Sequence, residues 1–350
     1  MSGTNDGIAP ADRGEASARR TPAAGRAGVL YVTTGSPERP TAEAVRDYLG
    51  RFLGDRRLVD LPRWKWMPIL KCIILPRRSP KSAERYARIW TDEGSPLVVN
   101  TEMQRAALQA RLAREGLDVP VVTCCLYSEP SVERGVSRLL DDMGVDRIVV
   151  LTCYPQYASV TVGSMAQRVL GCLATRKRVP SVDFIDSYCD DEAYLRALAA
   201  HVARSWTYVD DGAHRLIFSF HSTLCSDIDA GDVYRAQTER TSRAVAGLLG
   251  IPEHGWELGY QCVFDTHTPW LGPLTQTELL PRLAEQGVTD VAVVAPGFTS
   301  ECLETYDDVD RDQREAFLRL VPGGRFTYVP CLGCDEAFID ALAGIVRGRL

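Results

Sequence analysis

Residues 215–221, Arg215-Leu-Ile-Phe-Ser-Phe-His221, form an apolar run that reads as a buried β-strand ending in a histidine. Further along the chain, a second run of this kind, 290–295, leads into Pro296-Gly-Phe-Thr-Ser-Glu-Cys-Leu-Glu304. In an open parallel sheet, catalytic groups gather beyond the carboxyl ends of the strands. Histidine titrates near neutral pH and glutamate can hold or relay a proton, so we expect His221 and Glu304 to form a proton-handling pair.

Strand-like runs alternate with helical patterns on both sides of this stretch, as is typical of a parallel α/β sheet. The expected strands are 29–33, 119–126, 147–152, 182–186, 215–220 and 290–295, and the expected helices are 41–53, 82–90, 102–115, 131–143, 192–208, 236–250, 275–287, 311–320 and 335–348. The succession occurs twice, which predicts two Rossmann-like lobes with a ligand-binding cleft between them. No Gly-x-Gly-x-x-Gly or Walker sequence follows a strand, which argues against a nucleotide site.

The chain divides into four expected parts. Residues 1–27 are rich in Ala, Gly and Arg, contain acidic residues and lack an apolar segment, which predicts a disordered tail rather than a signal or transit peptide. Residues 28–187 are expected to form the first lobe and residues 188–330 the second. Residues 331–350 are expected to form a closing helix that packs back on the first lobe.

Charge and composition limit the partners. The chain has 350 residues, a formal net charge of −6 and a sequence pI near 5.5, so it has no basic surplus for nucleic acid. No apolar run approaches the roughly 20 residues that span a bilayer. The 11 cysteines occur without a secretion signal, which predicts reduced thiols and a cytoplasmic protein. The oligomeric state is left open by the sequence.

A strongly apolar segment, 64–76 (Trp-Lys-Trp-Met-Pro-Ile-Leu-Lys-Cys-Ile-Ile-Leu-Pro), lies at the start of a region, 64–80, that we call the apolar lip. Arg77, Arg78 and Lys81 follow it directly. Aromatic and aliphatic groups bordered by cations suit contact with a flat apolar ligand or, transiently, with a membrane surface. A core segment with a helical turn is the alternative interpretation.

Seven motifs, in chain order, resemble the ferrochelatase family, whose members insert ferrous iron into a porphyrin, and the resemblance covers nearly the whole chain from Gly28 to Leu350. They are Gly28-Val-Leu-Tyr-Val-Thr-Thr-Gly-Ser-Pro37, the stretch from Asp60-Leu-Pro to Ile74-Leu-Pro-Arg-Arg-Ser-Pro-Lys81, Ile89-Trp-Thr-Asp-Glu-Gly-Ser-Pro96, Tyr154-Pro-Gln-Tyr-Ala-Ser-Val-Thr-Val-Gly-Ser164, Ser219-Phe-His221 with Gly231-Asp-Val-Tyr234, Gln261 with Pro269-Trp-Leu-Gly-Pro273, and Pro296-Gly-Phe-Thr-Ser-Glu-Cys-Leu-Glu-Thr305. Agreement in order and spacing makes a chance match improbable.

The resemblance implies that a porphyrin, protoporphyrin IX or coproporphyrin III, is clamped between the lobes and converted to haem. It carries the acid/base roles onto His221 and Glu304. The expected substrate contacts are Tyr127, Tyr154, Ser164, Trp64, Met67, Ile73, Trp270 and Phe298. The expected metal contacts are His221, Glu304, Glu301, Cys302 and Asp308, with Glu301, Glu304 and Asp308 spaced to share one face of an α-helix. A favourable charge at a helix start is the plainer interpretation of these carboxylates.

The expected chemistry needs a base and a rigid wall. Two pyrrole N–H protons must leave before a divalent ion can sit among four nitrogens, and a neutral imidazole can accept one. An apolar cleft can bend the macrocycle with binding energy from remote contacts. Ferrous iron is then a substrate, and no cofactor is required.

The sequence departs from the family pattern near the expected site. His221-Ser-Thr-Leu224 changes the turn beside the base, and Cys125-Leu-Tyr-Ser-Glu-Pro130 keeps Tyr127 without the family's arginine. Thr33-Thr34 stands where Asn-Leu is usual. Two alternatives therefore stay open: a divergent chelatase acting on another tetrapyrrole or divalent metal, and a non-catalytic haem- or porphyrin-binding protein.

One further motif, Cys331-Leu-Gly-Cys334, suits redox or metal chemistry. Some ferrochelatases hold a [2Fe–2S] cluster through four cysteines, so such a cluster is a further alternative here, although no complete cluster motif aligns. An incidental structural role for this pair of cysteines is the main expectation.

Overall fold

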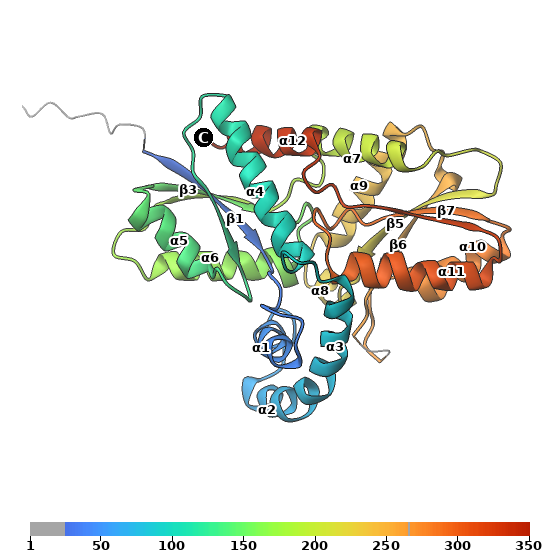
Figure 1. Ribbon diagram of the computed structural model, residues 1–350, viewed down its shortest axis with the longest axis horizontal. Helices are drawn as coiled ribbons and strands as arrows, with labels where there is room; N and C mark the ends of the chain where they lie inside the picture. Colours follow the sequence, from blue (N-terminus) through green and yellow to red (C-terminus); the bar gives the residue numbers. More distant parts are fainter. Residues whose placement is uncertain (1–24, 265–266) are drawn as a thin grey trace, which may run out of the picture.

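The computed structural model describes residues 25–264 and 267–350 of the chain. The expected disordered tail, residues 1–27, lies almost wholly outside this part. Within it, the protein has two four-stranded sheets in which every strand pairs in parallel with its neighbours, and helices cover both (Figure 1). The predicted two-lobed α/β class is confirmed.

The first sheet has the order β2-β1-β3-β4. Its strands are β1 (Ala27–Thr33), β2 (Val121–Cys125), β3 (Arg147–Thr152) and β4 (Ser181–Ile185). Its helical segments are α1 (Ala42–Phe52), α2 (Arg63–Ile69), η1 (Leu70–Ile74), α3 (Leu75–Ile89), α4 (Pro96–Arg114), α5 (Val132–Ser137), η2 (Arg138–Asp142), η3 (Ser159–Gly163) and α6 (Ser164–Ala174), of which η1, η2 and η3 are π-helical. The sequence prediction lacks α6.

The second sheet has the order β6-β5-β7-β8. Its strands are β5 (His214–His221), β6 (Trp256–Gln261), β7 (Asp290–Val294) and β8 (Arg325–Val329). The remaining helical segments are α7 (Glu192–Ser205), α8 (Cys225–Asp229), α9 (Tyr234–Leu248), the 3₁₀ turn η4 (Glu253–Gly255), the π-helical η5 (Thr275–Leu279), α10 (Leu280–Glu285), the π-helical η6 (Glu304–Gln313), α11 (Arg314–Leu320) and α12 (Glu336–Arg347). The prediction lacks the two edge strands, β6 and β8.

One apolar core joins the two sheets. Tyr31 of β1 and Phe218 of β5 belong to the same cluster of buried side chains, together with Phe338 and Leu342 of α12. The closing helix α12 contacts both α4, which covers the first sheet, and α7 (Figure 1). Because burial of these side chains is shared, the relative position of the lobes is fixed by close packing rather than by a linker.

The apolar lip is a continuous helical stretch, although none of the expected helices covers residues 64–80. Residues 63–89 run through α2, η1 and α3, which lie beside α1 and project from the body of the protein (Figure 1). Leu70 and Leu75 of this stretch are buried, whereas Trp64 is 75% exposed. Within the described ranges, no helix combines the length and apolar character needed to cross a membrane.

Candidate active site

A cleft of about 330 Å³ lies at the carboxyl ends of the strands and is lined by both lobes. The first lobe contributes the loop after β1, the inner faces of α1 and α3, and the loop after β3. The second lobe contributes residues 221–223, 262–264, 297–298, 302–304 and 308. Strand ends of two different sheets thus meet at one cavity, as expected for an open α/β fold.

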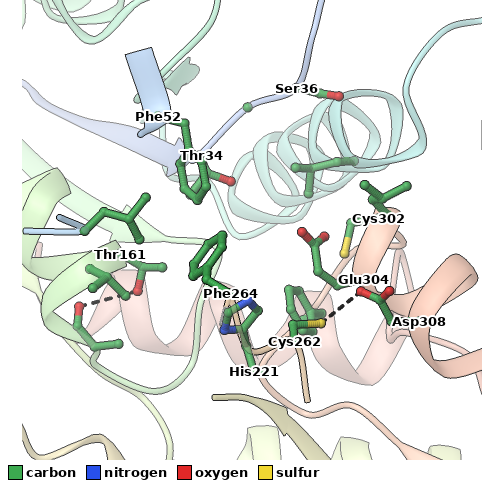
Figure 2. A pocket seen from close by; sticks show the side chains of 18 of the residues that line it. Thr34, Ser36, Phe52, Thr161, His221, Cys262, Phe264, Cys302, Glu304 and Asp308 are labelled. Carbon is green, nitrogen blue, oxygen red and sulfur yellow. Dashed lines mark hydrogen bonds between the residues drawn. The ribbon is translucent and has the colours of Figure 1, made fainter. Parts of the chain in front are cut away.

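His221 lies at the end of β5 and lines the cleft (Figure 2). Its Nδ1 lies 2.6 Å from the carbonyl oxygen of Ser222. A carbonyl oxygen only accepts hydrogen bonds, so Nδ1 is the donor in this contact, and in the neutral ring the lone pair is then on Nε2. The Ser222 hydroxyl donates to the Leu271 carbonyl at 2.7 Å and fixes the turn that follows. The backbone after His221 therefore orients the imidazole, and the Ser222 side chain holds that backbone in place.

Glu304 is the first residue of the π-helix η6 and its carboxylate points into the cleft (Figure 2). It forms no ion pair with any residue of the described part of the chain. Buried Cys302 lies beside it on the cleft wall, and burial, reinforced by the Glu304 carboxylate, raises the pKa of its thiol. His221 and Glu304, predicted as a pair, line the same cavity.

Asp308 also lines the cleft, one turn further along η6. Its Oδ2 accepts a hydrogen bond from the Cys262 thiol at 2.9 Å, and its Oδ1 pairs with the Arg85 guanidinium of α3. Burial raises the pKa of Asp308, and the charge of Arg85 opposes that rise. Neighbouring Asp307 is buried, pairs with Arg85, Arg88 and Arg311, and does not line the cleft.

Glu301 differs from the expected acidic stripe. Its Oε2 accepts from the Thr305 and Tyr328 hydroxyls, both at 2.7 Å, and its Oε1 accepts from the Cys331 backbone N–H at 2.8 Å. The residue precedes the helix, and the helix is π-helical, so the α-helical spacing that placed three carboxylates on one face does not apply. Glu301 holds the loop together and does not line the cleft.

The expected substrate contacts fall into two groups. Tyr154 and Phe298 line the cleft, and the Tyr154 hydroxyl lies 2.6 Å from Thr34 Oγ1. The other six residues do not line it: Tyr127, Ser164, Trp64, Met67, Ile73 and Trp270.

Five of these six absences have a local cause. Tyr127 is buried and its hydroxyl donates to Asp55 at 2.7 Å, and Ser164 is buried at the start of α6. The helical lip turns Trp64 and Ile73 outward, where they are 75% and 43% exposed, and Met67 packs on the inside of the lip against a separate small core.

Several cleft residues were not predicted. Thr34 and Ser36 come from the loop after β1, Cys262 and Phe264 follow the unpredicted strand β6, and Arg85 belongs to α3 (Figure 2). The ring of Phe264 lies under the Arg78 guanidinium at 5.2 Å and 5.6 Å from the Trp270 ring. The sequence could have indicated these residues only through the rule that sites lie at the carboxyl ends of strands, and applying that rule requires each strand to be recognised first.

The cysteines do not fit a four-thiolate cluster. Cys331 and Cys334 are half-buried and exposed, respectively, and the Cys331 backbone is engaged by Glu301. Across residues 25–264 and 267–350, the only group of three or more His, Cys, Asp or Glu with ligand atoms within 4.8 Å of one another is Asp307, Asp308 and Asp312. Arginines pair with all three members of that group.

Comparison with known proteins agrees with the fold and the motifs. The family model described as Ferrochelatase matches residues 26–350. The chain is 40% identical to the ferrochelatase of Aromatoleum aromaticum over 326 residues, which are 93% of this chain and 88% of that protein. It is 38% identical to the ferrochelatase of Haemophilus influenzae over 324 residues, 92% of this chain and 98% of that protein.

Solved structures resemble the fold at lower sequence identity. SirB from Bacillus subtilis, in a structure with Fe³⁺, matches with a TM-score of 0.51 and 14% identity over 92% of this chain and 94% of that one. DR2241 from Deinococcus radiodurans, described as structurally similar to chelatases, matches with a TM-score of 0.51 and 12% identity over 91% of this chain and 54% of that one. These matches agree with the two-lobed fold. The family model and the relatives at about 40% identity confirm the predicted family: the chain belongs to the ferrochelatases.

Proposed function

We propose that the protein inserts ferrous iron into a porphyrin bound in the cleft between its lobes. The observation that carries the proposal is one cavity lined by His221, with a free Nε2, and by Glu304, whose carboxylate has no cationic partner within the described residues. Membership of the ferrochelatase family supports the reaction class.

The base is His221. Its Nδ1–H is committed to the Ser222 carbonyl, so Nε2 accepts a pyrrole proton from a macrocycle that lies over the imidazole. The resulting imidazolium is stabilised by the Glu304 carboxylate in the same cleft, which takes up or relays the proton. A base without the acidic partner would have to hold the first charge unassisted while the second proton leaves.

Iron reaches the ring along η6 in this proposal. Glu304 and Asp308 present carboxylate oxygens to the cleft, and Cys302 adds a softer ligand beside them. Ferrous iron accepts oxygen, nitrogen and sulfur ligands, and weak contacts of mixed kind suit an ion that must be passed on. The wall of the first lobe is formed by Tyr154 with Thr34, and that of the second by Phe298.

The test is an anaerobic insertion assay. Protein is incubated with protoporphyrin IX or coproporphyrin III and with Fe²⁺ or Zn²⁺, and the metalloporphyrin spectrum is followed. His221→Ala should lower kcat by about 10² or more, the usual effect of removing a general base, while the porphyrin dissociation constant stays within about twofold. His254→Ala is the matched control, because His254 is exposed, pairs with Asp210 and does not line the cleft.

The outcomes separate the alternatives. Insertion by the wild type that His221→Ala removes supports a chelatase and ranks the two porphyrins and metals. Tight haem binding that His221→Ala abolishes, without insertion by the wild type, would favour a haem-binding protein instead. Binding of neither porphyrin would favour a divergent chelatase for another tetrapyrrole.

We also propose that the protein acts in the cytoplasm and contacts a membrane transiently through the apolar lip. Trp64, Ile69 and Ile73 are 75%, 41% and 43% exposed on one helical stretch, close in sequence to Lys65 and Lys71. Exposed aromatic and aliphatic side chains beside cations suit the lipid interface. Co-sedimentation with vesicles of neutral and anionic lipid should fall for Trp64→Ala, and equal sedimentation of both proteins would remove this proposal.

A further inference from the structure

Cys262 has an unusual backbone conformation at the edge of the cleft. Its φ is +63°, and it is the one non-glycine residue with positive φ in the described part of the chain. It directly follows β6, whose Gln261 is in register with His221 of β5. A residue with a β-carbon adopts this conformation at an energetic cost, and such residues cluster at functional sites.

The reason for the conformation lies in the two neighbouring side chains. In an extended strand, successive side chains point to opposite faces. Here Gln261 and Cys262 both contact η6: Gln261 Oε1 accepts from Gln313 Nε2 at 2.9 Å, and the Cys262 thiol donates to Asp308 Oδ2 at 2.9 Å. The left-handed turn at Cys262 is what lets two consecutive residues face the same helix.

Hydrogen bonds of the Gln261 side chain hold the backbone just before this turn in place. Its Oε1 also accepts from the Ser219 hydroxyl at 2.7 Å, two residues before His221, and all three side chains of this network are buried. Its Nε2 lies 3.5 Å from the carbonyl oxygen of Glu304. The strand that carries His221 and the helix that carries the acidic residues are therefore held together at Gln261.

The Cys262 thiol is the donor in its contact with Asp308, because a carboxylate oxygen accepts hydrogen bonds. The other Asp308 oxygen is held by Arg85 across the cleft. Arg85 alone would leave the carboxylate free to rotate about a single contact, and the thiol supplies the second.

We propose that Cys262 is a positioning residue that aims the Asp308 carboxylate into the cleft for the incoming divalent ion. The inference rests on the proposed metal insertion. It assigns Cys262 no contact with the reacting atoms: the residue acts through Asp308, and a hydroxyl in its place would do the same.

The test compares Cys262→Ala, Cys262→Ser and Cys262→Gly. The alanine variant loses the hydrogen-bond donor, and the serine variant keeps one. The glycine variant also loses the donor, but it adopts the positive-φ backbone conformation without the energetic cost. Cys172→Ala is the control, because Cys172 is a half-buried thiol of α6 that does not line the cleft. The KM for Zn²⁺, kcat and the porphyrin dissociation constant are measured for each, together with Mn²⁺ affinity of the porphyrin-free protein by electron paramagnetic resonance.

We expect Cys262→Ala and Cys262→Gly to raise the KM for Zn²⁺ and the Mn²⁺ dissociation constant by about three- to tenfold, the effect of losing one hydrogen bond to a charged group. Porphyrin affinity should stay within about twofold, and Cys262→Ser should restore both metal constants. An alanine variant with wild-type metal constants, or a serine variant as impaired as alanine, overturns the inference. A wild type that inserts no metal overturns the proposed function instead, and the Mn²⁺ constants then still decide the role of Cys262.

Discussion

Gln104 of α4 connects the two lobes behind the cleft, and its replacement by leucine is a strong test of how the site is held. Its Oε1 accepts from the Tyr31 hydroxyl of β1 at 2.9 Å and from the Ser300 hydroxyl at 3.1 Å. Its Nε2 donates to the carbonyl oxygens of Thr299 and Gly333 at 2.8 and 2.9 Å. The side chain is fully buried, so water cannot replace these partners.

The magnitude follows from the partners left behind. A typical buried hydrogen bond contributes about 1 kcal/mol, so Gln104→Leu, which strands partners of four bonds, should lower the free energy of unfolding by about 4 kcal/mol. The same helix offers a control: half-buried Gln109 makes two hydrogen bonds within the first lobe, to the backbone of Val119 and Val121. Water can partly replace them, so Gln109→Leu should cost at most about 2 kcal/mol.

Urea unfolding followed by circular dichroism measures both changes, and the insertion assay adds a second readout. The loop from Pro296 to Glu304 depends on the Gln104 contacts, so Gln104→Leu should also lower kcat at temperatures where the variant is folded, whereas Gln109→Leu should not. Equal loss of stability in the two variants, or full activity in folded Gln104→Leu, would refute the idea that this amide sets the position of the loop.

Three further predictions follow from single contacts. Glu301→Gln should lower the free energy of unfolding by about 2 kcal/mol, because an amide N–H would face donors from Thr305, Tyr328 and Cys331. The KM for Zn²⁺ should stay unchanged, and a raised KM would indicate that Glu301 contacts the metal after all. Thr34→Val removes the 2.6 Å contact with Tyr154 and should weaken porphyrin binding about fivefold in a fluorescence-quenching titration, and an unchanged affinity would show that this hydroxyl pair does not touch substrate. Burial raises the pKa of Cys125 to about 11 and of Cys153 to about 12, so both stay protonated and unlabelled by iodoacetamide at pH 8 while exposed Cys72 and Cys334 react; mass spectrometry of labelled peptides checks this, and early labelling of Cys125 would contradict it.

The parts of the fold that the sequence predicted are those with strong apolar runs. All six expected strands exist, and five of them (β1, β2, β3, β5 and β7) are buried over most of their length and mainly apolar. The sixth, the edge strand β4, is mostly half-buried and was recognised from its short alternation of apolar and polar residues. The strand Trp256–Gln261 escaped recognition because it lies at a sheet edge, carries half-buried residues in its first half and contains Gly259. That glycine is required by packing, since a β-carbon there would lie 2.5 Å from the Thr275 hydroxyl.

The helical conformation of the lip was not predicted because the segment contains prolines. Pro68 lies inside α2 and Pro80 inside α3, where proline removes a backbone donor and normally ends a helix. The π-helical turn of η1 lies between them and widens the helix at this point. Apolar content alone therefore identified an unusual segment but not its conformation.

The site residues that the sequence predicted correctly are those near the carboxyl ends of strands. His221 ends β5, and Phe298 and Glu304 lie in the segment that follows β7, so the topology of a parallel sheet brings them to one edge. Tyr127 and Ser164 belong to motifs near the cleft, yet their side chains turn into the first lobe, which no spacing rule indicates. Contacts that depend on tertiary packing, such as that of Cys262 with Asp308, could not be predicted from the pattern of residues along the chain.

The π-helical form of η6 has a consequence for how the acidic residues are distributed. Its hydrogen bonds run from residue i to i+5, so each turn is wider than in an α-helix and residues four apart come nearly into line. Glu304 and Asp308 thereby form one column, which faces the cleft, and Asp307 and Arg311 form an adjacent column, joined by a 2.7 Å ion pair. One short helix thus carries two different edges. The column toward the cleft includes the Glu304 carboxylate, which forms no ion pair among the described residues, and the column toward the protein is paired with arginines.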